Sequence, residues 1–297
     1  MKNIVIILSF TIPLIISCSG EQEKHMSAKD IDSVHKFVSE LNTSLNSFNY
    51  SFIKQHWNHS AFKSRIGKLD NTGKGVYNHI YETQLKSNIV NANLNLINLV
   101  KHHNAKLLHL NTNIVADYAE TTYLILKNDN TFNITKYRID VKNGTLTLTD
   151  FFNFREDQWF SETMREVLLL NLKHTTASRY RLEANQAYSN YIQAQQEQDF
   201  ELAYNYLEQI PETHRILNDY KIAKLLTASN INDSVLQHSI NQVNDTVNGN
   251  TIYIDYLLSN YHTDTDFKEE VQARMRKELG INKKLLDSLT QANTIWW

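Results

Sequence analysis

The sequence predicts an α+β domain, in which helices cover a roughly four-stranded antiparallel sheet, followed by an all-α domain of helical repeats. Apolar residues recur at helical spacing between residues 31 and 100, and β-branched and aromatic residues dominate between residues 105 and 152. Spacings of 34 and 33 residues then relate three later segments. Only 7 glycines and 2 prolines occur in 297 residues, which favours long helices.

The first elements are expected to be helices. Apolar residues recur every three or four positions from Ile31 to Phe48, which predicts an amphipathic helix, and Asp30 is a candidate N-cap before it. The apolar residues between Phe52 and Phe62 predict a second, short helix. A third helix is expected from Val76 to Val100, although its Asn91–Leu99 segment is also compatible with a strand.

A change of hydrophobic period then predicts strands. Lys142-Asn143-Gly144 is a strong hairpin signal, because Asn and Gly tolerate the positive φ of a type I′ turn, and Lys127–Asn130 is a second turn signal. Short turns join antiparallel neighbours, so a meander of about four strands is expected, closed by a helix that begins near Trp159. The predicted strands are Ala105–Leu110, Val115–Leu126, Thr131–Val141 and Thr145–Phe152.

The segment 28–172 resembles NTF2-like domains in its order of elements, with the cystatin-like α+β layout as the neighbouring alternative. The closest local similarity is LNSFNYSFIKQHW, which ends at Trp57. The resemblance implies a pocket between the helices and a curved sheet, and Trp57, Tyr118 and Tyr137 are the candidate pocket residues. Packing in the hydrophobic core is the alternative role of these three side chains.

The segment 173–297 is predicted to form three helix pairs. Asp199, Asp233 and Asp266 are separated by 34 and 33 residues, and each is placed to cap the second helix of a pair. Two helices in such a period resemble the tetratricopeptide repeat, with DFELAYNYLEQI, starting at Asp199, as the best single match. The resemblance is degenerate, because the later units lack the small residue that separates the paired helices. A generic helical bundle is the alternative.

The single cysteine of the chain follows an apolar N-terminal segment. Lys2 and the 13-residue run Ile4–Ile16 predict a signal peptide over residues 1–17, since this run is shorter than the roughly 20 residues of a bilayer span. Ile15-Ile16-Ser17-Cys18 resembles a bacterial lipobox. The resemblance implies cleavage before the cysteine and attachment of acyl chains, so that residues 18–27 form a lipidated tether to a membrane.

The residues after Cys18 predict where in the cell envelope the protein lies. Ser19 is not the aspartate that retains lipoproteins at the inner membrane in some Gram-negative systems. Acidic residues such as Glu21 and Glu23 resemble surface-export signals of other lipoproteins. The expected location is therefore the outer membrane, with the cell surface as the preferred side.

Composition and repeats together predict the class of partner. The formal net charge is -2, and basic residues are mixed with acidic ones, so a nucleic-acid partner is not expected. Helical repeats commonly bind peptides or protein surfaces, which predicts a protein partner in the envelope. Tyr253, Tyr256 and Tyr261 are candidate contact residues, with packing against neighbouring helices as the alternative.

No motif in the sequence predicts an enzyme. P-loop, GxGxxG, GxSxG and HExxH patterns are missing, and the one cysteine excludes an intrachain disulfide or a Cys-based metal cluster. Neither a metal nor another cofactor is expected, although several histidines occur, namely His56, His59, His102, His103 and His109. The predicted function is a non-enzymatic, membrane-anchored scaffold. A ligand-binding lipoprotein and an active site assembled from distant segments are the alternatives.

Overall fold

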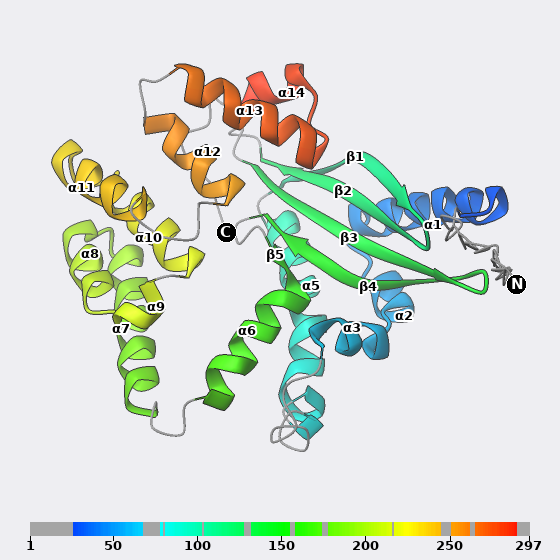
Figure 1. Ribbon diagram of the computed structural model, residues 1–297, viewed down its shortest axis with the longest axis horizontal. Coiled ribbons are helices and arrows are strands. Elements are labelled where there is room, and N and C mark those ends of the chain that lie inside the picture. Colours follow the sequence, from blue (N-terminus) through cyan, green and yellow to red (C-terminus); the bar gives the residue numbers. More distant parts are fainter. Residues whose placement is uncertain are drawn as a thin grey trace, which may run out of the picture.

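The computed structural model describes residues 26–67, 78–79, 81–102, 104–127, 132–154, 158–173, 178–215, 217–244, 251–261 and 265–289 (Figure 1). The predicted signal peptide, Cys18 and most of the predicted tether lie outside these ranges. Within the ranges, no helix combines the length and the apolar character needed to cross a membrane.

Among the described residues, several helices and a π-helical turn precede the sheet. They are α1 (Ala28–Asn46), α2 (Ser51–His56), α3 (His59–Ile66), the π turn η1 (Tyr81–Leu85) and α5 (Lys86–His102). The segment 91–99 is helical, which resolves its ambiguity in favour of a helix. The N-cap of α1 is Ser27, whose hydroxyl accepts from the Asp30 backbone N–H, so the expectation that Asp30 itself caps this helix was wrong.

The sheet is an antiparallel meander of five strands. The strands pair in chain order as β1 (Lys106–Val115), β2 (Tyr118–Leu126), β3 (Phe132–Lys142), β4 (Thr145–Asn153) and β5 (Gln158–Trp159). The predicted Asn-Gly hairpin is confirmed, with φ of +52° at Asn143 and +74° at Gly144. β1 extends five residues beyond its predicted end at Leu110, because a bulge there lets pairing continue to a turn at Ala116. Positive φ at an alanine is uncommon, so the sequence does not signal this turn.

The first core lies between one face of the sheet and the helices α1, α2, α3, α5 and α6 (Phe160–Lys173). The linker between α2 and α3 is fixed to β4, because the Asn58 backbone N–H donates to the Leu148 carbonyl at 2.8 Å. The strand residues that enter this core alternate along the chain, as expected for one sheet face. They include Ala119, Tyr123, Ile125, Tyr137 and Ile139.

The second core lies on the opposite face of the sheet, because its strand residues occupy the alternate positions. Leu124 and Ile134 are register partners in this core, whereas their neighbours Tyr123 and Ile125 belong to the first. The helices α12 (Ile252–Tyr261), α13 (Thr265–Leu279) and α14 (Lys283–Leu289) supply most of the other side. The sheet is thus apolar on both faces and is covered on both.

Two aromatic pairs join α12 to β3 and to Phe154, the residue that follows β4. The Phe132 and Tyr256 ring centroids lie 5.4 Å apart at 75°, and those of Phe154 and Tyr253 lie 5.2 Å apart at 71°. Both are edge-to-face arrangements, which stabilise an interface beyond the area that they bury. All four rings are buried. The C-terminal helices and the sheet therefore share one continuous core.

The remaining helices extend away from the sheet, as Figure 1 shows. They are α7 (Ser178–Gln196), α8 (Phe200–Glu208), α9 (Glu212–Arg215), α10 (Asn218–Ala228) and α11 (Asp233–Asn244). α7 packs on α8, and α10 packs on both α8 and α11. The expected cap at Asp199 is confirmed, since its carboxylate accepts from the Leu202 N–H at 3.0 Å, whereas the cap of α11 is Asn232 and not Asp233.

Gly280 permits the close approach of α13 to β1. It follows the helix with a φ of +71°, a left-handed conformation that favours glycine. A Cβ at this position would lie 1.6 Å from Nδ2 and 2.8 Å from Cγ of Asn111, on β1. The left-handed backbone therefore favours glycine here, and a larger residue would also have to displace the Asn111 side chain.

We expect Gly280→Ala to lower the free energy of unfolding by about 2–3 kcal/mol, because strain at positive φ adds to a steric clash. Gly144→Ala is the matched control, since its Cβ would meet nothing within 4 Å at a similar φ of +74°. This control should cost only about 1 kcal/mol. Urea unfolding measures both values.

The clash itself can be isolated with a double-mutant cycle. In an Asn111→Ala background, the cost of Gly280→Ala should fall to that of Gly144→Ala, because the side chain that blocks the new Cβ is gone. Equal costs for the two glycine substitutions in the unmodified chain would contradict this packing.

Candidate functional site

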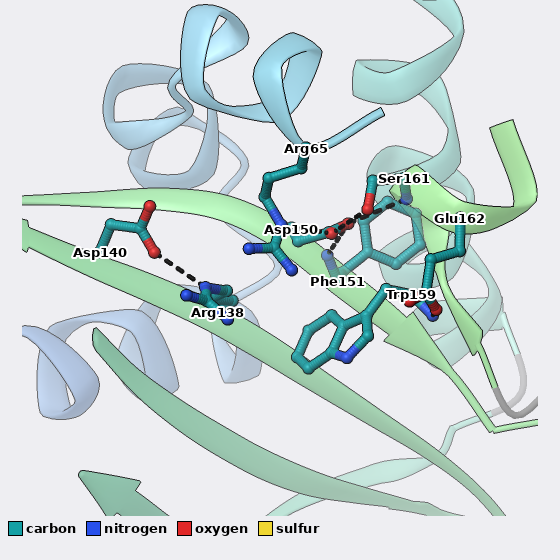
Figure 2. Close-up of polar contacts among 8 residues, drawn as sticks. All are labelled: Arg65, Arg138, Asp140, Asp150, Phe151, Trp159, Ser161 and Glu162. Atoms are coloured by element: carbon teal, nitrogen blue, oxygen red, sulfur yellow. Dashed lines mark hydrogen bonds and ion pairs between the residues drawn. The ribbon is translucent and has the colours of Figure 1, made fainter. Parts of the chain in front are cut away.

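A buried carboxylate with four donors is the most extensive polar site among the described residues. Asp150 is fully buried and accepts from Arg65 Nε at 2.8 Å, Ser161 Oγ at 2.5 Å, the Ser161 N–H at 3.1 Å and the Phe151 N–H at 3.0 Å. Figure 2 shows these groups converging at the edge of the sheet. We refer to Arg65, Asp150, Phe151 and Ser161 as the Asp150 cluster.

Three elements bring the Asp150 cluster together. Asp150 lies on β4 beside a bulge opposite Arg138 and Ile139, Arg65 lies in the last turn of α3, and Ser161 lies in the first turn of α6. The carboxylate thereby satisfies two donors near the N-terminus of α6, where a negative charge is stabilised by the helix dipole. The start of α6 is closed by Glu162, whose carboxylate accepts from the Trp159 N–H at 3.0 Å.

Burial dominates the electrostatics of this cluster. Desolvation raises the pKa of the Asp150 carboxyl, and the hydrogen bonds from Ser161 and Arg65 and the charge of Arg65 oppose that increase. Asp150 has no exposed side-chain surface and Arg65 keeps 25%. A substrate could reach only the Arg65 side of the cluster, so the arrangement is suited to holding α3 and α6 against β4 and not to catalysis at the carboxylate.

The sheet separates the three candidate pocket residues. Trp57 and Tyr137 are both buried in the first core, where the Phe151 ring contacts each of them, at 6.2 and 6.5 Å between centroids. Tyr118 lies on the opposite face, because its register partner is Asp140, an odd number of residues from Tyr137. The structure therefore brings Trp57 and Tyr137 together and leaves Tyr118 apart from them.

Tyr118 instead belongs to a polar row on the face that carries the second core. The Arg138 guanidinium lies 3.4 Å from the centroid of the Tyr118 ring and donates from Nε to Asp140 at 2.9 Å. Figure 2 shows the Arg138–Asp140 pair on the sheet, apart from the Asp150 carboxylate. Both partners of this pair are partly exposed, with 18% and 34% of their side-chain surface accessible.

The two buried tyrosines of the candidate partner-binding set face the interior. Tyr253 and Tyr256 are the α12 side chains that pack on Phe154 and Phe132, and Tyr261 is partly buried against the same core. Burial raises the pKa of Tyr256 to about 12. Packing, the alternative role proposed from the sequence, accounts for the position of all three.

A buried lysine organises the polar contacts between α8, α10 and α11. Lys224 is 2% exposed, and its ammonium donates to the Glu208 carboxylate and, at 3.2 Å, to the Tyr220 hydroxyl. It also lies 5.4 Å from the centre of the Tyr204 ring, whose hydroxyl hydrogen-bonds to Ser239 Oγ at 2.9 Å. Glu208 also forms an ion pair with Arg215 at 3.7 Å. These contacts link α8 with α10 through Lys224 and α8 with α11 through Tyr204.

The described residues contain no group of three or more His, Cys, Asp or Glu side chains positioned to hold a metal ion. Cys18, the predicted lipid-attachment residue, lies outside the described ranges. No protein-family model matches the chain, and the searches of curated proteins and of solved structures also return no match.

Sequence reasoning assigned no function to Arg65, Asp150 or Ser161. The only local signal is that Asp150 interrupts the largely apolar end of a predicted strand, in the segment LTLTDFF. Its cation is 85 residues away, and the start of α6 is 11 residues away. Such a cluster depends on tertiary packing, which no local pattern in a single sequence reports.

We expect Arg65→Met to lower the free energy of unfolding by about 3 kcal/mol at neutral pH, because it leaves the Asp150 charge buried without its cation. The substitution should also raise the pKa of Asp150 further. A carboxyl whose pKa is raised by folding stabilises the folded state most below its unfolded-state pKa and loses that contribution as the pH rises. The deficit of the variant should therefore shrink as urea unfolding is repeated at increasingly acidic pH.

Arg138→Met is the matched control, because it removes an arginine from a partly exposed pair on the same sheet. It should cost about 1 kcal/mol or less, with little dependence on pH over the same interval. A deficit for Arg65→Met that is no larger than that of the control, or that does not change with pH, would show that the Asp150 carboxylate does not depend on Arg65.

Proposed function

We propose that the protein is a non-enzymatic, lipid-anchored scaffold of the cell envelope that binds a protein partner through α7 and α8. The observation that carries this proposal is the exposure of two aliphatic side chains on one helix pair. Ile192 on α7 is 52% exposed and Leu202 on α8 is 38% exposed, and α7 packs on α8. A contiguous patch of exposed apolar side chains marks a surface that another protein covers, and we propose that Ile192 and Leu202 belong to one such patch.

The position of this helix pair supports the proposal. α7 and α8 lie away from the sheet, whereas α12, α13 and α14 are used to cover it (Figure 1). Tyr253 and Tyr256 of α12 are buried in the second core and are not exposed to a partner. The first helix pair of the C-terminal region is thus the part best placed to contact another molecule.

We further propose that residues 28–172 form an NTF2-like domain and that residues 173–297 are degenerate tetratricopeptide-like repeats. The helix–sheet order, the packing of α7 on α8, of α10 on α11 and of α12 on α13, and the Asp199 cap support this assignment. Trp57 and Tyr137 are buried in the first core, where both contact the Phe151 ring. A filled core at this position favours a scaffold over a protein that binds a ligand between these two side chains.

The proposed anchor is Cys18 within the lipobox-like segment Ile15–Cys18. Acylation of its thiol and of the new N-terminus would hold the folded protein at the outer membrane. The first described helix begins at Ala28, so nine residues lie between the attachment point and this helix.

Cys18→Ala should abolish metabolic labelling of the protein with a radioactive fatty acid. The reason is that this thiol is the only one in the chain. Ser17→Ala keeps a small residue before the cysteine and should leave labelling unchanged. Labelling that persists in Cys18→Ala would exclude the lipoprotein assignment.

A photo-cross-linking amino acid placed at position 192 or 202 should capture one specific envelope protein in living cells, identified by mass spectrometry. Ile192→Asp and Leu202→Asp should each reduce recovery of that protein by about tenfold, because a buried charge opposes an apolar contact. Leu108 on β1 is the matched control, since it is 38% exposed, as Leu202 is. Capture of only lipids and abundant porins, or equal capture from position 108, would refute the scaffold.

A further inference from the structure

A polar hollow lies where the end of α13 meets the sheet. It has a volume of about 410 Å³, and its lining includes Asn111, Asn113, Glu120, Lys136, Lys277 and Glu278. This volume is within the roughly 300–1,000 Å³ of sites that hold small ligands. The hollow is separate from the surface of α7 and α8 that is proposed to bind a partner protein.

The register of the sheet explains why these side chains converge. Asn111, Thr122 and Lys136 form one row across β1, β2 and β3, and Asn113 and Glu120 are partners in a nearby row. Both rows lie on the face that carries the second core, beside the apolar residues that α12, α13 and α14 cover. The hollow thus lies next to the part of this face that the apolar side chains of α12, α13 and α14 cover.

The walls of the hollow are fixed by contacts of their own. The Lys136 ammonium donates to the Glu278 carbonyl at 3.1 Å, at the carbonyl end of α13, and lies 4.7 Å from the centre of the Phe152 ring. The Glu278 carboxylate accepts from Arg274 Nε at 3.4 Å. Gly280, where a Cβ would clash with Asn111, lets the helix end come close enough to form a wall. Contacts from both the sheet and the end of α13 therefore fix the shape of the hollow.

Four side chains in the hollow are open to a ligand. The side chains of Asn111, Asn113, Glu120 and Lys277 form no hydrogen bond or ion pair with any other residue that the structure describes. Two amides, one carboxylate and one ammonium can together donate and accept several hydrogen bonds. In ligand sites, a few convergent polar groups fix the orientation of the ligand.

We propose that this hollow binds a neutral, polyhydroxylated ligand, namely a sugar unit of a glycan. Its two lysines and two glutamates, Lys136, Lys277, Glu120 and Glu278, balance in charge, which gives no net attraction for an anion or a cation. Sugar hydroxyls donate and accept hydrogen bonds at once, and so match amides flanked by a carboxylate and an ammonium. A site built in this way selects its ligand by the number of hydroxyl groups that it satisfies.

The test is isothermal titration calorimetry of the full chain with neutral disaccharides of glucose, mannose, galactose and N-acetylglucosamine. At least one sugar should bind, and Asn113→Ala and Lys277→Ala should each weaken its Kd by about fivefold or more. Both residues are exposed, so these variants should keep the thermal stability of the unmodified protein. Arg276→Ala is the matched control, because Arg276 is exposed beside Lys277 but does not line the hollow, and it should leave Kd unchanged.

Inorganic phosphate and free glycine are the charged and zwitterionic comparison ligands, and neither should bind or displace the sugar. The proposal is overturned if none of the sugars binds, if sugar binding is unchanged in Asn113→Ala and Lys277→Ala, or if phosphate or glycine binds in the hollow and the sugars do not. These results are independent of cross-linking at positions 192 and 202, so each proposal can fail without the other.

Discussion

The structure depends on a sheet that is apolar on both faces. In β3, residues that alternate along the strand enter opposite cores, with Tyr137 in one and Phe132 and Ile134 in the other. A sheet of this kind is stable only when both faces are covered. The helices before the sheet and α6 cover one face, and α12 covers the other through Tyr253 and Tyr256. The C-terminal helices are consequently part of the folded core of the sheet.

Because helices must cover both faces of the sheet, different parts of the molecule remain for ligand binding and for partner binding. The end of α13 approaches β1 at Gly280, and beyond it the sheet face turns from apolar to polar, which forms the hollow around Asn113 and Glu120. The helices that do not cover the sheet, α7 and α8, keep Ile192 and Leu202 exposed. At the sheet edge, the buried carboxylate of Asp150 joins two helices to β4 through its hydrogen bonds. Packing, partner binding and ligand binding thus use different residues.

Local signals in the sequence were sufficient for most of the elements. The Asn143-Gly144 hairpin and the cap at Asp199 follow from turn and capping chemistry, which depends on a few adjacent residues, and both are confirmed. Local signals of this kind do not predict which residues distant in sequence contact one another. Tyr118 and Tyr137 lie on different strands, so the pairing register between β2 and β3 is needed to show that their side chains occupy opposite faces of the sheet. The contact of Tyr256 with Phe132 spans more than a hundred residues, so no periodic pattern could assign that tyrosine to packing.

The shared core is tested most directly by native-state hydrogen exchange, with peptides of β3 and α12 followed by mass spectrometry at increasing urea. If α12 is part of the core of the sheet, amides of both elements should open with the same free energy, and Phe132→Ala should lower both values equally. If α12 opens at a lower free energy and responds weakly to Phe132→Ala, the C-terminal helices fold separately, and the account of a sheet covered on both faces is contradicted.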